Sequence, residues 1–152
     1  MKTRAEIDII AVGKLKEEYL RNAQEKFLKE LNQRARINVI EIKDEKTKEG
    51  ASDRELERVK NLEGKSIIKH LDPRGKIIAM DLSGKKTTSD ELSKILESEL
   101  LDGQKIQFVI GGSLGISSEI LAMAHKRISF GAMTYPHQLF RVMLLEELKK
   151  SI

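Results

Sequence analysis

The chain alternates short apolar runs with longer segments whose apolar residues recur every three or four positions. We expect strands at residues 7–12, 36–42, 76–82, 105–110 and 128–133. Helical periodicity is found in the intervening residues 14–33, 52–68, 88–100, 117–124 and 136–148. Strands that alternate with helices in this way predict an α/β domain with a mostly parallel sheet.

Length and composition favour one folded domain. The chain has 152 residues, of which 39% are hydrophobic, so it is long enough to bury a core and is not disordered. It contains no cysteine, which excludes a cysteine nucleophile and suits a reducing cytoplasm. No apolar run approaches the roughly 20 residues of a membrane span, so no membrane association is expected. The net charge of +4 favours a polyanionic partner only slightly.

Local signals mark the helix starts and the turns. Ser52 with Glu55 and Thr88 with Glu91 have the spacing of capping boxes. Residues 72–75 and 83–86 are expected to form turns, and the polar segment 43–51 to form an exposed, mobile loop.

Three turns follow predicted strands, after Leu82, Ile110 and Met133. The carboxyl ends of strands are where ligands bind in parallel sheets. These three turns are therefore expected to build one pocket.

The turn after Ile110 is rich in glycine and reads GGSLG. Gly111, Gly112 and Gly115 would allow a ligand to approach the backbone, because glycine lacks a Cβ atom. The motif matches neither the dinucleotide fingerprint nor the phosphate-binding P-loop. A tight loop without a ligand explains the pattern equally well.

The third turn reads TYPHQ, and Pro136 is expected in the first turn of the last helix. His137 would lie at that helix N-terminus, which disfavours an imidazolium ion. Arg141 follows four residues later, on the same helical face. The alternatives are a capping role for His137 and, for Arg141, a surface ion pair with Glu146 or Glu147.

Other catalytic motifs are missing from the sequence. His70 and His125 have no partners at the spacing of metal ligands, and no carboxylate-rich loop is present. No metal is therefore expected. Ser113 does not lie in a G-x-S-x-G elbow, which argues against a hydrolase nucleophile.

Four segments together resemble one known family. The segments IIAVGKLKEEY, IIAMDLSGK, FVIGGSLG and SFGAMTYPHQLFRVMLLEE are similar, in this order, to the ribosomal RNA large subunit methyltransferase H family. The resemblance extends from about Ile7 to about Glu147, and its most specific part is GGS-x-G followed by the PHQ-x-x-RV segment.

The resemblance implies a single SPOUT methyltransferase domain over residues 1–152, with helices on both faces of the sheet and a C-terminal trefoil knot. It implies a homodimer that uses S-adenosylmethionine to methylate N3 of a pseudouridine in the 23S rRNA of the assembled ribosome. The family's cofactor contacts fall on Met80, Gly111, Phe130, Gly131, Ala132, Met133, Thr134 and Tyr135.

The same resemblance suggests the catalytic residues. N3 of a uracil-type ring carries a proton, so a base must help to remove it, and His137 is the candidate. Arg141 is expected to hold an RNA phosphate or the negative charge that develops on a uracil oxygen.

The resemblance ends at the last residues of the chain. Family members continue with a Tyr-Arg-Ala-like segment and a tail that contains Tyr-His, whereas this sequence reads LLEELKKSI up to Ile152. One alternative is therefore a catalytically impaired homologue that binds S-adenosylmethionine or the ribosome. Without the resemblance, an α/β nucleotide-binding enzyme for another small substrate is the second alternative.

Overall fold

A parallel sheet forms the centre of the protein, in a computed structural model that describes residues 5–101, 103–131 and 137–152. The strands of this part are β1 (Glu6–Val12), β2 (Arg36–Ile42), β3 (Lys76–Lys86), β4 (Ile106–Ile110) and β5 (Lys126–Ser129). They form one sheet in the order β2-β1-β4-β3-β5, and each neighbouring pair is parallel. The predicted α/β class is thus confirmed. The knot stays a prediction, because it depends on residues 132–136, outside the described ranges.

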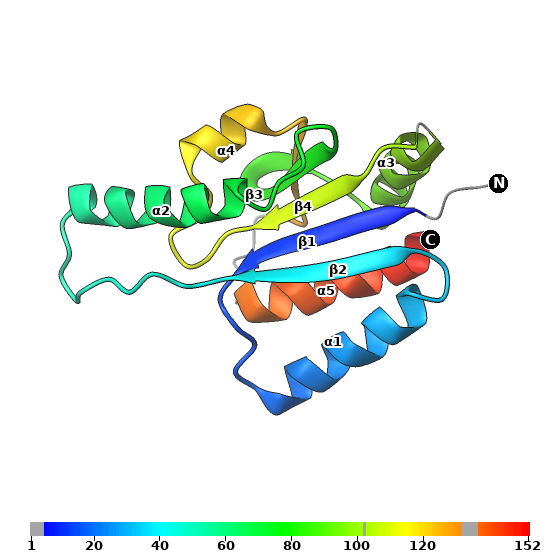
Figure 1. Ribbon diagram of the computed structural model, residues 1–152, viewed down its shortest axis with the longest axis horizontal. Helices are drawn as coiled ribbons and strands as arrows, with labels where there is room; N and C mark the ends of the chain where they lie inside the picture. The colour runs from blue at the N-terminus through cyan, green and yellow to red at the C-terminus, as the bar shows by residue number, and fades with distance from the viewer. Residues whose placement is uncertain (1–4, 102, 132–136) are drawn as a thin grey trace.

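Helices cover both faces of this sheet. They are α1 (Glu18–Leu31), α2 (Asp53–Ile68), α3 (Ser89–Leu101), α4 (Ser118–Met123) and α5 (His137–Ser151). Figure 1 shows α1 and α5 on one side of the sheet and α2 and α4 on the other. The buried residues of α3 join the core of α1 and α5.

Neighbouring side chains of β1 enter two different cores. Ile7 and Ile9 pack in the cluster with α1, α3 and α5, whereas Ile10 and Val12 pack in the cluster with α2 and α4. A strand that is covered on both faces reads as a continuous apolar run rather than an alternating one. This burial explains the apolar run that ends at Val12.

The expected caps form at the helix N-termini. Ser52 Oγ accepts a hydrogen bond from the Glu55 backbone amide at 3.2 Å. Thr88 and Glu91 form the reciprocal pair of a full capping box, at 3.1 and 3.3 Å. Ser117 caps α4 in the same way as Ser52 caps α2. Each cap satisfies amide groups that the first helical turn leaves without a partner.

The turn predicted at residues 83–86 is wrong. β3 continues to Lys86, and its pairing with β5 shifts between Met80 and Lys85, which both face Ile128. Gly84 lies against the β5 backbone, and a Cβ atom there would be 2.7 Å from the Arg127 carbonyl carbon. The glycine that suggested a turn instead permits close contact between two strands. β5 itself ends at Ser129, earlier than predicted.

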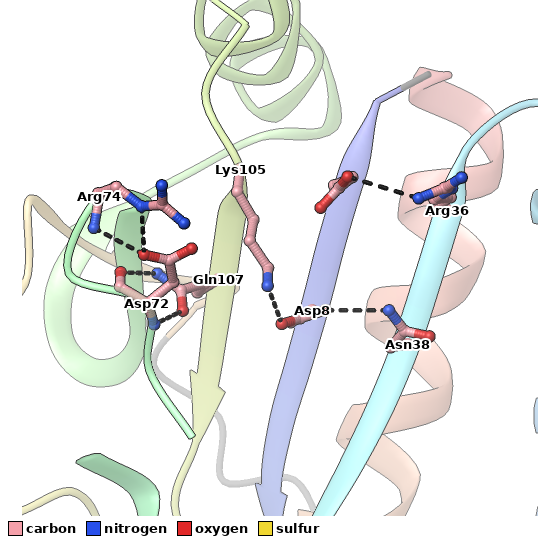
Figure 2. A network of polar contacts seen from close by, with 8 residues as sticks. Asp8, Arg36, Asn38, Asp72, Arg74, Lys105 and Gln107 are labelled. Carbon is pink, nitrogen blue, oxygen red and sulfur yellow. Dashed lines mark hydrogen bonds and ion pairs between the residues drawn. The ribbon is translucent and has the colours of Figure 1, made fainter. Parts of the chain in front are cut away.

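A network of polar side chains lies toward the amino ends of the strands (Figure 2). The Asp8 carboxylate, 4% exposed, accepts hydrogen bonds from Lys105 Nζ at 3.0 Å and Asn38 Nδ2 at 3.3 Å. Gln107 is fully buried and bonds both the amide and the carbonyl of Asp72. The hydrogen bond to Asp8 raises the pKa of the Lys105 ammonium. Asp8 and Gln107 are therefore buried together with their hydrogen-bond partners.

We expect Lys105→Ala to lower the free energy of unfolding by about 3 kcal/mol, because it leaves the buried Asp8 carboxylate without its counter-ion. Asp8→Asn should cost only about 1 kcal/mol, since the Lys105 side chain, 27% exposed, can turn to water. Urea denaturation at pH 7 measures both, with Arg58→Ala in the exposed Arg58–Glu55 pair as control. Equal effects of Lys105→Ala and the control would contradict this assignment.

Candidate functional site

A cavity of about 550 Å³ lies at the carboxyl ends of β4 and β5 and beside residues 80–82 of β3, the strand between them. Apolar side chains and glycine backbone make up most of its wall. The lining residues are Met80, Asp81, Leu82, Ile110, Gly111, Gly112, Ser113, Gly115, Ile116, Ile128, Ser129, Phe130, Gly131 and Phe140. Both its size and its position at the strand ends suit a small-molecule ligand.

Leu82 lies within β3 and is not followed by a turn, and the turn expected after Met133 lies outside the described residues. Of the three turns that the sequence singled out, the glycine turn after Ile110 is the one that the structure places in the cavity. Met80, Gly111, Phe130 and Gly131 line it, as expected for cofactor contacts. The other expected contacts, residues 132–135, lie outside the described residues, and their role stays a prediction.

The glycine turn forms one wall of the cavity. The Gly115 amide donates to the Gly112 carbonyl at 3.1 Å, and Gly115 has a φ of 85°. A Cβ atom on Gly111 would lie 2.7 Å from the carbonyl carbon and oxygen of Gly115. The backbone folds back on itself here, and only glycine at 111 permits so close an approach.

An aromatic pair forms another part of the cavity wall. The rings of Phe130 and Phe140 have centroids 5.1 Å apart and planes tilted by 38°. Directly before Phe130, Ser129 Oγ accepts a hydrogen bond from the Gly131 amide at 3.1 Å and donates one to the Gly131 carbonyl at 2.9 Å. Sequence reasoning missed Phe140. Its position one helical turn after Pro136 was the available signal.

Arg141 lies at the ends of β1 and β2 rather than in the cavity wall. Its side chain is only 1% exposed, and Nη1 forms an ion pair with Glu41 Oε2 at 2.7 Å. Nη2 donates to the Gly13 carbonyl, also at 2.7 Å. Nε is buried without a partner among the described residues. The surface alternative for Arg141 is wrong, because the guanidinium joins α5 to the sheet from inside the fold.

His137 is the first residue of α5, so the expected position at a helix N-terminus is confirmed. The side chain of His137 is not among the described parts of the structure. The next residue, Gln138, accepts a hydrogen bond from the Lys16 amide at 2.9 Å. The start of α5 is thereby attached to the segment that follows β1.

The described ranges contain no cluster of three or more His, Asp or Glu side chains that could hold a metal ion. His125 forms a hydrogen bond with the main chain, since its Nδ1 accepts from the Ile77 amide at 3.0 Å. None of the helices in these ranges is long and apolar enough to cross a bilayer.

Gly111→Ala should distort the glycine turn and weaken ligand binding in the cavity, because the added methyl group meets backbone that cannot move aside. Gly112→Ala is the matched control, since its Cβ would meet the Val12 side chain at 3.1 Å. We expect a loss of about 2 kcal/mol for Gly111→Ala and clearly less for the control. Thermal unfolding and calorimetric ligand binding measure both, and equal behaviour would contradict the prediction.

Known proteins are similar to this chain over most of its length. The sequence profile of the family described as "Predicted SPOUT methyltransferase" matches residues 5–151. The chain is 47% identical over 146 residues to the ribosomal RNA large subunit methyltransferase H of Clostridium botulinum strain Hall, covering 95% of this chain and 92% of the relative. It is 49% identical over 143 residues to the protein of the same name from Clostridium kluyveri, covering 93% and 90%. The chain therefore belongs to the SPOUT methyltransferase family, and its relatives in that family are ribosomal RNA large subunit methyltransferases H.

Proposed function

We propose that this protein transfers a methyl group from S-adenosylmethionine to N3 of a pseudouridine in the 23S rRNA of the assembled ribosome. The observation that carries the proposal is the cavity beside β3, β4 and β5, whose lining includes Met80, Gly111, Phe130 and Gly131, four of the expected cofactor contacts of the family to which the chain belongs. The names of the relatives support rRNA as the substrate.

The residues present fit this cofactor. The cavity has room for a ligand of nucleoside size, and its apolar wall with Phe130 and Phe140 suits an adenine ring. The absence of a side chain at Gly111 lets the ligand meet main-chain groups directly. In this arrangement Met80, Gly111, Phe130 and Gly131 bind the cofactor, together with the undescribed residues 132–135.

The chemistry demands mainly alignment and one proton transfer. S-adenosylmethionine supplies a methyl group already activated on a sulfonium. For transfer to N3, the protein would have to hold N3 of the target base in line with that methyl group. The N3 proton must leave, and His137, at the start of α5, is the proposed base. The target base must be accessible, which favours a loop nucleotide or a flipped-out base.

The contacts of Arg141 support an indirect role. A guanidinium that is 1% exposed and holds both Glu41 and Gly13 would have to leave these partners to reach an RNA phosphate. We therefore propose that Arg141 holds α5, and with it His137, at the ends of β1 and β2. The alternative is that Arg141 contacts the RNA, or the negative charge that develops on the uracil oxygen, directly. Experiment must distinguish this role from the positioning of α5.

The remaining parts of the proposal concern the assembly. We propose that the protein acts as a homodimer in the cytoplasm, where assembled ribosomes are found. Its net charge of +4 is compatible with an RNA partner. A catalytically impaired homologue that binds S-adenosylmethionine or the ribosome without transferring a methyl group is the alternative, and no feature of the cavity favours it.

The decisive measurement is radiolabelled methyl transfer from S-adenosylmethionine to ribosomes that lack the modification. We expect transfer by the wild-type chain and at least a hundredfold loss in His137→Ala, with the affinity for S-adenosylmethionine unchanged, because removal of a general base affects the chemical step. Cofactor binding without transfer by the wild type would favour the impaired homologue. Full activity of His137→Ala would exclude it as the base.

Arg141→Ala and Glu41→Ala separate the two roles of Arg141. If Arg141 positions α5, both variants should lose stability, by about 3 kcal/mol for Arg141→Ala, and both should lose transfer together. If Arg141 contacts the RNA, only Arg141→Ala should lose transfer. Lys149→Ala, which removes a more exposed ion pair of α5 with Glu30, is the control for general damage to the helix.

A further inference from the structure

Glu63 is a buried acid that the proposed chemistry does not use. It lies on α2 and is only 3% exposed. Its Oε2 accepts a hydrogen bond from the Glu45 amide at 3.0 Å, in the segment that follows β2. Its Oε1 is buried and has no donor among the described residues. A buried carboxylate oxygen without a partner is costly, so its environment requires an explanation.

The neighbouring carboxyl group of Asp44 supplies that explanation. Burial is the main reason why the pKa of Glu63 is raised to about 7, and a hydrogen bond with Asp44 and the charges of Asp44 and Glu45 raise it further. The Glu45 amide acts in the opposite direction. No Lys or Arg in the described residues forms an ion pair with Glu63 or Asp44. Two carboxyl groups can share a hydrogen bond only while one of them carries a proton.

This pair lies directly behind the glycine turn of the cavity. A Cβ atom built on Gly112 would be 3.8 Å from Asp44 Oδ1, and Gly112 lines the cavity. On the other side, Gly64 packs so closely on Ser117 that a Cβ atom would collide with the serine side chain. Ser117 caps α4, a few residues after the glycine turn. One turn of α2 therefore contacts Ser117 directly through Gly64, and it reaches Gly112 indirectly, through the segment that Glu63 binds.

We propose that Glu63 is a positioning residue for the cavity: its protonated carboxyl group donates a hydrogen bond to Asp44 and holds residues 44–45 against Gly112, so that the glycine turn keeps the shape that binds the cofactor. The effect on cofactor binding rests on the function proposed above. The contact of residues 44–45 with Glu63 and Gly112 does not depend on that function, and it can be measured in the absence of any ligand.

The direction of the pH dependence follows from linkage. With residues 44–45 in place Glu63 titrates near pH 7, whereas after release it titrates near its ordinary value of 4.5. Between these values, release of the segment also releases a proton, so rising pH favours release by up to about tenfold per pH unit. The contact is strongest below pH 4.5, weakens up to about pH 7 and then stays constant.

Hydrogen exchange of the ligand-free protein between pH 5 and pH 8, corrected for the intrinsic exchange rate, tests the contact. In the wild type we expect protection of the amides of residues 44–46 and 111–113 to fall by about tenfold or more over this range. Glu63→Gln keeps an acceptor for the Glu45 amide and a permanent donor for Asp44, so its protection should be high and independent of pH. Glu63→Ala should lack protection at every pH.

The affinity for S-adenosylmethionine, measured by calorimetry at pH 6 and pH 8, connects the contact to the cavity. The wild type should bind several-fold more weakly at pH 8, and Glu63→Gln should show a smaller difference. Asp44→Asn, which removes the like charge, should also reduce the difference. Glu57→Gln, on the exposed side of α2, is the control and should behave as the wild type.

The outcomes distinguish this proposal from the proposed function. Wild-type protection that does not change with pH, or Glu63→Gln that depends on pH as the wild type does, would overturn the proposal. A pH-dependent contact with an unchanged cofactor affinity would also overturn the role in the cavity. If no variant binds S-adenosylmethionine, the proposed function fails, and hydrogen exchange still decides whether Glu63 holds the segment.

Discussion

The position of β4 between β1 and β3 is the constraint on which the other parts of the protein depend. β4 pairs in parallel with both neighbours, from Ile106 to Ile110, and all five of its residues are buried. This pairing places the glycine turn beside the end of β3, and β5 then adds the third strand end through its own pairing with β3. The cavity is a consequence of strand order, because its walls come from segments of β3, β4 and β5 that pairing in the sheet brings side by side.

Polar groups inside the fold have different roles at the two ends of the sheet. At the amino ends, Asp8 is neutralised by Lys105 and shielded from water, which serves stability. At the carboxyl ends, Arg141 joins α5 to β1 and β2, and Glu63 faces another acid instead of a base. Arg141 thus has an acid as its partner, whereas the neighbour of Glu63 carries the same charge.

The sequence predicted much of the fold because its local signals agree with its tertiary structure. The N-cap at Ser52, the capping box at Thr88 and the doubly buried strands could be predicted without knowledge of distant contacts. Gly84 misled the prediction, because whether a glycine makes a turn or a close strand contact depends on β5, more than forty residues away. The burial of Arg141 and the pairing of Glu63 with Asp44 could not be predicted either, since both depend on chain segments that only the folded sheet brings together.

The distance in sequence between paired strands also determines when the site can form during synthesis. β1 can pair with β4, its second neighbour, only after Ile106 has been synthesised, because Ile106 is the partner of Ile7. Such non-local pairing slows folding. Every lining residue of the cavity follows residue 79, and Phe140 lies on the last helix. A chain still emerging from the ribosome can therefore complete α1 and the β1–β2 pair early, but it acquires a ligand site only once nearly all of it has been translated.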